Sequence, residues 1–479
     1  MINLALASIL LPATGAVLIA LSPRSVAKQL CQIFSGLATA VLLYLGYQFS
    51  RGDSAPVERA MISFGDVEIL GFGVDNVSIL VAVAVVGIGF LIAIYSGGYL
   101  DAGNREHPDI VKRRYFAFLS LFIGAMAGLV FSSTLIGQLV FFEISGLCSW
   151  ALIGYYEKPK SLYSAAKALI ITHIASIGLY VAASLLFLHS NTFSLGAIGN
   201  LPDGVKTVVL LAILVAAWGK SAQVPFHMWL PDAMEAPTPI SAYLHAASMV
   251  KVGVYIFARA LMSSNGAPEI VGYVCTIMAT VTLVYGFIMY LPQCDMKRLL
   301  AYSTITQLAY MFLGLGLSVF GSKLAFNGAI SHLFNHAFAK TLFFLVAGAL
   351  SYTTGTRMLP LLRGILSKSP LLGIAFVVAA LAIAGVPPFN GFFSKFQIFA
   401  GGFEVAEQHP LLMVLLVIAL LESVGSFAWF LKWVGWSVPG RPSEAVAAAS
   451  PVPLSMQIVL VVLIIMSVCS SFIAAAWLG

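Results

Sequence analysis

Apolar runs of about twenty residues recur along almost the whole of this 479-residue chain. An α-helix needs a run of that length to cross the hydrocarbon layer of a membrane, because each residue advances the helix by only about 1.5 Å. Charged residues make up 9% of the chain, whereas soluble domains carry about 25%. We therefore expect an all-α polytopic membrane protein of about fourteen transmembrane helices. The first run, 2–21, lacks a cleavage-site pattern and is expected to be a retained helix.

Basic residues predict the orientation of these helices. With the N-terminus outside, fifteen of the 25 Lys and Arg residues fall in cytoplasmic loops, five in the opposite loops and five inside spans. Because cytoplasmic loops are enriched in Lys and Arg, we expect both termini outside, at a bacterial inner (plasma) membrane. The expected spans are 2–21, 29–49, 73–99, 114–131, 134–155, 164–188, 206–224, 240–261, 269–291, 298–318, 322–352, 371–400, 411–435 and 455–477.

The sequence offers no sign of a bound cofactor. The five cysteines are far apart and form no C-x-x-C pair, which argues against a zinc site, an iron–sulfur cluster or a disulfide framework. A phosphate-binding loop and a dinucleotide-binding glycine pattern are also missing from the sequence. The basic residues are spread among short loops, so nucleic acid is not an expected partner. We expect no cofactor in this chain, and any redox centre would belong to partner chains.

Proline interrupts two of the expected helices in a matching way. The seventh carries Pro225 shortly after Lys220, and the twelfth carries Pro387 and Pro388 shortly before Lys395. Proline removes a backbone N–H and clashes with the preceding turn, so both helices should break there. Broken helices at corresponding positions of two halves indicate an inverted repeat with an ion site near the membrane midplane. Two unrelated kinks are the simpler alternative.

The repeat interpretation divides the chain into four regions. Residues 1–113 would hold helices one to three, and 114–263 would form the first inverted repeat, of helices four to eight. Residues 264–436 would form the second, of helices nine to thirteen, and 437–479 would hold a loop and the last helix.

Seven ionisable residues fall well inside the expected spans. An unpaired charge at a helix centre costs about 2.5–3.5 kcal/mol on insertion scales, so these groups must be paired, hydrated or neutral. A buried lysine that can gain and lose its charge is suited to carrying protons. Snorkelling to the headgroups is the alternative for the first lysine of the set, and structural pairing with a lysine is the alternative for the last glutamate. The seven are Glu143, Lys167, Lys220, Lys251, Lys340, Lys395 and Glu422.

Histidines accompany the buried lysines. His332, His336 and Lys340 follow one another at intervals of four, which places them along one stripe of a helix. His245 and Lys251 are six residues apart with Ser248 between them, so their stripe drifts around its helix and can connect two neighbours. Histidine titrates nearest to neutral pH, so these side chains and the lysines together predict a proton path.

Several stretches closely resemble the antiporter-like membrane subunits of respiratory complex I. That family includes subunits of multisubunit sodium/proton antiporters and of membrane-bound group 4 nickel–iron hydrogenases, and the resemblance covers about 75–435. The whole chain, including 105–108 and 442–446, looks most like the component D subfamily of hydrogenase-4, found in formate hydrogenlyase-type complexes. The motifs are FFE at 141–143, GKSAQVPFH at 219–227, WLPDAM at 229–234, EAPTP at 235–239, LHA at 244–246, NHAFAK at 335–340 and GVPPF at 385–389.

The resemblance implies fourteen helices, two inverted five-helix repeats and a role for most of the buried charges. Lys167 matches a family position of less clear role, and Glu422 matches none. The implied roles are Glu143 and Lys220 as the charge pair of the first half-channel, His245 and Lys251 as a bridge, His332, His336 and Lys340 as the centre of the second half, and Lys395 as the terminal charge.

The leading prediction is a proton-translocating subunit of a redox complex of the hydrogenase-4 type. Its partners would be other antiporter-like membrane subunits and a hydrophilic arm with nickel–iron hydrogenase and iron–sulfur subunits. The first alternative is a subunit of a sodium/proton antiporter without redox coupling, although two intramembrane carboxylates against five lysines favour protons. The second is a structural membrane anchor, which would not require a line of charges.

Overall fold

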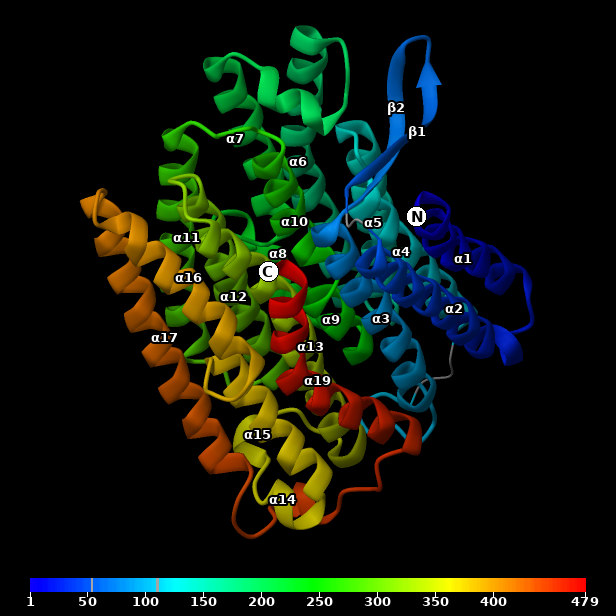
Figure 1. Ribbon diagram of the computed structural model, residues 1–479. Coiled ribbons are helices and arrows are strands. Elements are labelled where there is room, and N and C mark those ends of the chain that lie inside the picture. Colours follow the sequence, from blue (N-terminus) through cyan, green and yellow to red (C-terminus); the bar gives the residue numbers. More distant parts are fainter. Residues whose placement is uncertain (53–54, 109–111) are drawn as a thin grey trace.

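The protein is a bundle of long helices (Figure 1). The computed structural model describes residues 1–52, 55–108 and 112–479. In this described part, twelve helical stretches are long and apolar enough to cross a membrane, with Thr238–Met262 counted as one, which confirms the predicted all-α polytopic membrane fold. The two remaining predicted spans are the proline-interrupted ones: the helix predicted over 206–224 ends at Lys220, and the span predicted over 371–400 is divided into two shorter helices.

The helices correspond closely to the predicted spans. Four short 3-10 turns lie between them, at Leu195–Asn200, Phe226–Met228, Ala233–Glu235 and Leu359–Leu361. The α-helices are α1 (Ile2–Leu21), α2 (Arg24–Arg51), α3 (Asn76–Tyr99), α4 (Arg113–Phe131), α5 (Leu135–Ile153), α6 (Pro159–Ser190), α7 (Asp203–Lys220), α8 (Trp229–Asp232), α9 (Thr238–Ala246), α10 (Met249–Met262), α11 (Glu269–Tyr290), α12 (Met296–Ser318), α13 (Lys323–Thr354), α14 (Ile365–Lys368), α15 (Pro370–Ala384), α16 (Asn390–Ala406), α17 (Pro410–Ser437), α18 (Glu444–Ala447) and α19 (Leu454–Leu478).

A β-hairpin precedes α3 and was not expected from the sequence. Strands β1 (Val57–Phe64) and β2 (Val67–Val74) pair in antiparallel register, with Phe64 opposite Val67, and the hairpin projects past the neighbouring ends of α1 and α5 (Figure 1). The two-residue connection begins with Gly65, whose φ of +61° is readily adopted by glycine. Helix α3 then starts at Asn76 because Asp75 forms a capping box with Ser78.

Both predicted proline breaks are present. Helix α7 ends at Lys220, five residues before Pro225, and α15 ends at Ala384, before Pro387 and Pro388. Each break therefore leaves a lysine beside non-helical backbone, Lys220 at the end of α7 and Lys395 in the second turn of α16.

A third break, between α9 and α10, contradicts the continuous helix predicted over 240–261. Ser248 has φ −114° and ψ −102°, and its Oγ donates a hydrogen bond of 2.8 Å to the Tyr243 carbonyl. A serine hydroxyl that bonds the preceding turn competes with the helical ladder. Because the segment contains neither proline nor glycine at that point, its sequence carries no recognisable break signal.

Helix α13 forms the centre of the bundle. All of its residues from Gly328 to Thr354 are buried, and it packs against α3, α9, α12, α15, α16 and α19. A helix buried on every side is expected to be apolar throughout, yet the buried part of this one carries two histidines and Lys340. The titratable groups therefore lie in the core of the molecule.

Candidate proton pathway

Eight of the ten predicted site residues are buried, with less than a tenth of each side chain exposed. They are Lys220, His245, Lys251, His332, His336, Lys340, Lys395 and Glu422. The other two, Glu143 and Lys167, have 29% and 25% of their side chains exposed.

Lys220 meets α5 through a backbone carbonyl. Its Nζ donates to the Phe142 carbonyl at 3.0 Å and lies 4.0 Å from the centre of the Phe142 ring. The next residue, Glu143, instead has Oε2 3.1 Å from Nδ1 of His173 on α6. The predicted partners Glu143 and Lys220 thus come together at α5, but they form no direct ion pair among the described residues. His173 was missed from the sequence because it is the single histidine of the predicted span 164–188 and its acidic partner lies on another helix.

Lys167 lies deeper in its helix than predicted. Helix α6 begins at Pro159, five residues before the predicted start at 164, so Lys167 is about two turns inside it. Its Nζ lies 2.7 Å from Oδ2 of Asp232 on α8. Lys167 of α6 is therefore paired with the short helix α8, which follows the break after α7. Its acidic partner is not apparent from the sequence, where Asp232 is only one member of a family motif.

The central group joins α10, α12 and α13. Lys251 donates to the Leu333 carbonyl, and Lys340 donates to Oγ of Ser303. His332 lies between two polar partners, with Nδ1 2.8 Å from Oγ of Ser394 and Nε2 3.1 Å from Oε1 of Gln307. The predicted stripe on α13 is thus tied to the neighbouring helices on either side.

Two histidines of this group have ring nitrogens without a described hydrogen-bond partner. The His336 ring lies 5.8 Å from that of His332, and the His245 ring lies 5.3 Å from that of Phe344 on α13. Neither nitrogen of His245 or His336 has a hydrogen-bond partner in the described part of the chain. Buried polar atoms of this kind are the groups that internal water satisfies, which makes both rings suitable for relaying a proton.

The far end of the path is a cluster of hydroxyl groups around one carboxylate. Glu422 accepts hydrogen bonds from Tyr310, Tyr290 and Ser426. Nζ of Lys395 lies 4.5 Å from the centre of the Tyr310 ring and 3.3 Å from Oγ of Ser423. The tyrosine therefore links the terminal lysine to the glutamate. From the sequence, aromatic residues are expected only to pack, so this contribution was missed.

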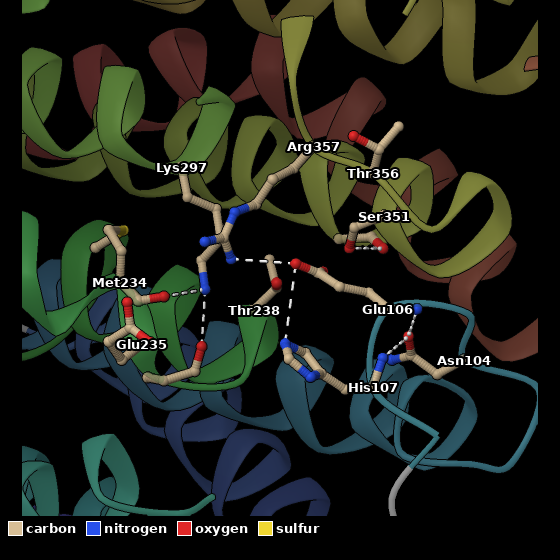
Figure 2. Close-up of polar contacts among 12 residues, drawn as sticks. Asn104, Glu106, His107, Met234, Glu235, Thr238, Lys297, Ser351, Thr356 and Arg357 are labelled. Atoms are coloured by element: carbon tan, nitrogen blue, oxygen red, sulfur yellow. Dashed lines mark hydrogen bonds and ion pairs between the residues drawn. The ribbon is translucent and has the colours of Figure 1, made fainter. Parts of the chain in front are cut away.

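A polar cavity of about 120 Å³ lies at one end of the bundle, where α9 and α12 begin. Figure 2 shows the Glu106 carboxylate facing Arg357 and His107. Oε1 of Glu106 lies 3.2 Å from NH1 of Arg357 and 3.9 Å from Nε2 of His107, while Oε2 is buried without a described partner. Lys297 donates two hydrogen bonds of 2.7 Å, to the Met234 and Ala236 carbonyls (Figure 2).

We call the residues that line this cavity the mouth cluster. Helices α9 and α12 lead from it toward the buried groups. Thr238 lines it and begins α9. His245 lies seven residues further, on the same face and about 10 Å deeper. On α12, Lys297 lines the cavity and Ser303, the acceptor of Lys340, lies about 9 Å deeper. Partial burial lowers the pKa of His107, and the Glu106 carboxylate opposes that effect.

The sequence matches a known family of membrane proteins. The family model described as "NADH:quinone oxidoreductase/Mrp antiporter, TM" matches residues 132–422, which is more than half of the chain. The chain belongs to this family. A second model, the N-terminus of chain 5 of NADH-ubiquinone oxidoreductase (complex I), matches residues 62–116. The predicted family is thereby confirmed.

Two similar curated proteins are components of Na⁺/H⁺ antiporters. The A component from Alkalihalophilus pseudofirmus is 37% identical over 380 residues, which cover 75% of this chain and 46% of the relative. The A1 component from Staphylococcus haemolyticus is 35% identical over 419 residues, 82% of this chain and 51% of the relative. The chain spans about half the length of these relatives.

Two solved structures share the fold. One is the Mrp complex from Dietzia sp. DQ12-45-1b, with a TM-score of 0.87, 27% identity and coverage of 99% of this chain and 51% of that chain. The other is the membrane-bound sulfane sulfur reductase, an archaeal respiratory membrane complex, with a TM-score of 0.84 and coverage of 99% and 95%. Its 22% identity supports the fold alone.

These relatives favour one of the alternatives left open by the sequence. The curated proteins named above are sodium/proton antiporter components, and neither is a hydrogenase component. The hydrogenase-4 resemblance, with its hydrogenase and iron–sulfur partners, is therefore not supported. An antiporter-like subunit of a multi-subunit membrane complex is the function class that these matches support.

Proposed function

We propose that this chain is the proton-conducting antiporter-like subunit of a Mrp-type sodium/proton antiporter in the bacterial plasma membrane. The observation that carries the proposal is the group of buried lysines and histidines around α13, joined by hydroxyl and amide groups of α12 and α16. The similarity to Na⁺/H⁺ antiporter components supports the same conclusion. A structural anchor would be more stable with apolar side chains at these positions, because buried charges oppose insertion.

The chemistry of the group suits protons better than sodium. Sodium requires several oxygen ligands around one ion, whereas the eight buried residues of the path include four lysines and a single carboxylate, Glu422. Lysine and imidazole nitrogens exchange protons with each other and with water. We therefore propose that this chain carries the proton half of the exchange and that partner subunits complete the sodium path.

We further propose that protons reach the buried groups through the mouth cluster. The unpartnered oxygen of Glu106 can accept a hydrogen bond from water in the cavity. From there Thr238 and His245 provide one route along α9, and Ser303 and Lys340 provide a second along α12. Both routes end at α13, where His332 and His336 lie next to each other.

The test is sodium-driven proton movement in everted membrane vesicles that contain the intact complex. Addition of NaCl should collapse an imposed pH gradient with the wild type, whereas Lys340→Ala should abolish the collapse. Lys368→Ala is the matched control, because Lys368 is an exposed lysine outside the path, and it should behave as wild type. Sodium-driven exchange that survives Lys340→Ala would refute the proposed path. Purification in mild detergent should yield Mrp-type subunits; co-purification of nickel–iron hydrogenase subunits would refute the assignment to an antiporter.

A further inference from the structure

A groove lies between α1 and α4, beside the start of α2. It measures about 730 Å³ and is lined by residues of both helices. The two helices touch where Oγ of Ser120 donates to the Pro12 carbonyl at 2.7 Å, and the groove lies between this contact and the ends of the helices at Arg24 and Arg113. Helix α1 lies at the edge of the bundle (Figure 1), so the groove opens toward the surrounding membrane.

The walls of the groove are apolar stripes at helical spacing. On α1 the stripe consists of Ala13, Ala16 and Ala20 together with Val17, and on α4 it includes Phe118 and Leu121. Residues three and four apart lie on one face of a helix. The alanines leave room on the α1 side, and the larger side chains of α4 form the opposite wall. A groove of this shape can accommodate an acyl chain lying along the helices.

The rim of the groove is strongly basic. Arg24, Lys112, Arg113 and Arg114 line it, with Glu157 as the one carboxylate. Lys112 and Arg114 share that carboxylate, at 2.8 Å and 2.5 Å. Four cations therefore face one anion, and the rim has a formal charge of +3.

Two of these guanidinium groups retain free donors. NH1 of Arg113 donates to the Ser22 carbonyl at 2.9 Å, which uses one of its five N–H groups. The Arg24 side chain makes no hydrogen bond or ion pair within the described part of the chain. Arginine binds phosphate through paired N–H groups, so both residues can hold a phosphodiester at the membrane surface.

From these observations we infer that the groove binds an anionic phospholipid, with its phosphate at Arg24 and Arg113 and an acyl chain along Ala13–Ala20. Charge complementarity selects this occupant over an apolar helix of a partner subunit. Such a helix would leave four cations at the rim without added counter-charge, whereas an anionic headgroup pairs with them. The Lys and Arg distribution predicts that these residues lie on the cytoplasmic side of the membrane. The cytoplasmic leaflet is the one that carries anionic lipids.

The test measures anionic phospholipid retained by the intact complex after purification in mild detergent, by lipid extraction and mass spectrometry. Arg24→Gln combined with Arg113→Gln should weaken binding of phosphatidylglycerol about 30-fold. The matched control, Lys368→Gln with Arg441→Gln, removes the same charge from exposed residues outside the groove and should retain the lipid. Equal loss in both double variants would show nonspecific surface attraction and overturn the proposal.

A second pair of variants tests the apolar part of the site. Ala20→Trp fills the groove and leaves the basic rim in place, whereas Leu18→Trp adds the same bulk on another face of α1 where the side chain is 47% exposed. Added phosphatidylglycerol should raise the melting temperature of the wild type. Only Ala20→Trp should lose both the bound lipid and this rise in melting temperature. Retained lipid would overturn the acyl-chain site, and loss of a partner subunit with lipid unchanged would identify a protein occupant instead.

Discussion

Neutral oxygens hold the four buried lysines of the candidate path. In the described part of the chain none of these four ammonium groups forms an ion pair with a carboxylate. A lysine bound to a neutral acceptor can lose its proton without leaving an unpaired buried anion behind, whereas a direct carboxylate partner favours the charged form. The pairs are Lys220 with the Phe142 carbonyl, Lys251 with the Leu333 carbonyl, Lys340 with Ser303 and Lys395 with Ser423.

The first prediction follows for Lys220. Lys220→Ala should abolish sodium-driven proton movement in everted vesicles, and Lys220→Arg should reduce it nearly as much. A guanidinium fits the acceptor of an ammonium poorly and does not release its proton at accessible pH. Normal transport by the arginine variant would mean that Lys220 acts only as a fixed positive charge.

A second residue-scale prediction concerns His107 in the mouth cluster. Burial lowers its pKa below the ordinary value of 6.5, and the neighbouring Glu106 carboxylate acts in the opposite direction. Glu106→Gln removes the carboxylate and should lower the pKa of His107 further. The measurement is the pH dependence of the His107 ring signal in selectively labelled protein, which should titrate below pH 6.5 in the wild type.

Linkage gives this prediction a sign for stability. The pKa of His107 is lower in the folded state than in the unfolded state. Above the unfolded pKa, the contribution of His107 to the free energy of unfolding does not change with pH. As the pH falls from the unfolded pKa to the folded one, the unfolded state binds more protons, so the folded protein loses stability. His107→Gln should therefore reduce the loss of melting temperature on acidification below pH 6.5. A pKa of His107 that rises in Glu106→Gln would contradict the described geometry.

At the scale of elements, close contacts between helix backbones position the lysines. Gly253 of α10 faces the end of α7, and a Cβ at this position would overlap the Ala217 carbonyl oxygen and Oγ of Ser221. Ser221 in turn donates to the Val250 carbonyl at 2.6 Å. The residue that follows Lys220 is therefore held against α10 through a contact that only glycine permits.

The third prediction is that Gly253→Ala destabilises the protein and impairs transport. Overpacking a tight contact costs about 1–3 kcal/mol, and here it would displace the end of α7 together with Lys220. Gly435→Ala is the matched control, because this helical glycine has no neighbour within 4 Å of the added carbon and alanine favours a helix by about 1 kcal/mol. Melting temperature and vesicle transport should fall only for Gly253→Ala.

Elements were predictable from sequence wherever the signal was local. Hydropathy located the spans, and proline located the breaks after α7 and α15. The β-hairpin and the break at Ser248 were missed, since each depends on few residues: a glycine turn in one case and a serine hydroxyl in the other. Within the site, the lysines and the histidines at helical spacing stand out against an apolar background. Tyr310 and the single histidine His173 can be assigned to the site only from their contacts with residues of other helices.

At the scale of the whole molecule, the two ends of the chain lie on one side of the bundle. Nε1 of Trp477, near the end of α19, donates to the Asn76 carbonyl at the start of α3 at 2.8 Å. The β-hairpin leads into the same end of α3, and α1 and α2 form an antiparallel pair before it. An even number of crossings explains this placement. Which side faces the cytoplasm is still a prediction from the Lys and Arg distribution.

The last prediction therefore tests orientation with single cysteines. Cys294 and Cys469 are the two exposed cysteines, and changing both to serine leaves three buried thiols as background. In that protein Ser63→Cys, in the hairpin, should react with a membrane-impermeant maleimide in intact cells. Asp101→Cys, after α3, should react only once the cells are opened. Both positions are exposed and lie at opposite ends of α3, so they are a matched pair.

The reverse pattern would invert the predicted orientation and place the mouth cluster outside. Labelling of both positions in intact cells would mean that α3 does not cross the membrane, and the predicted count of spans would then be wrong.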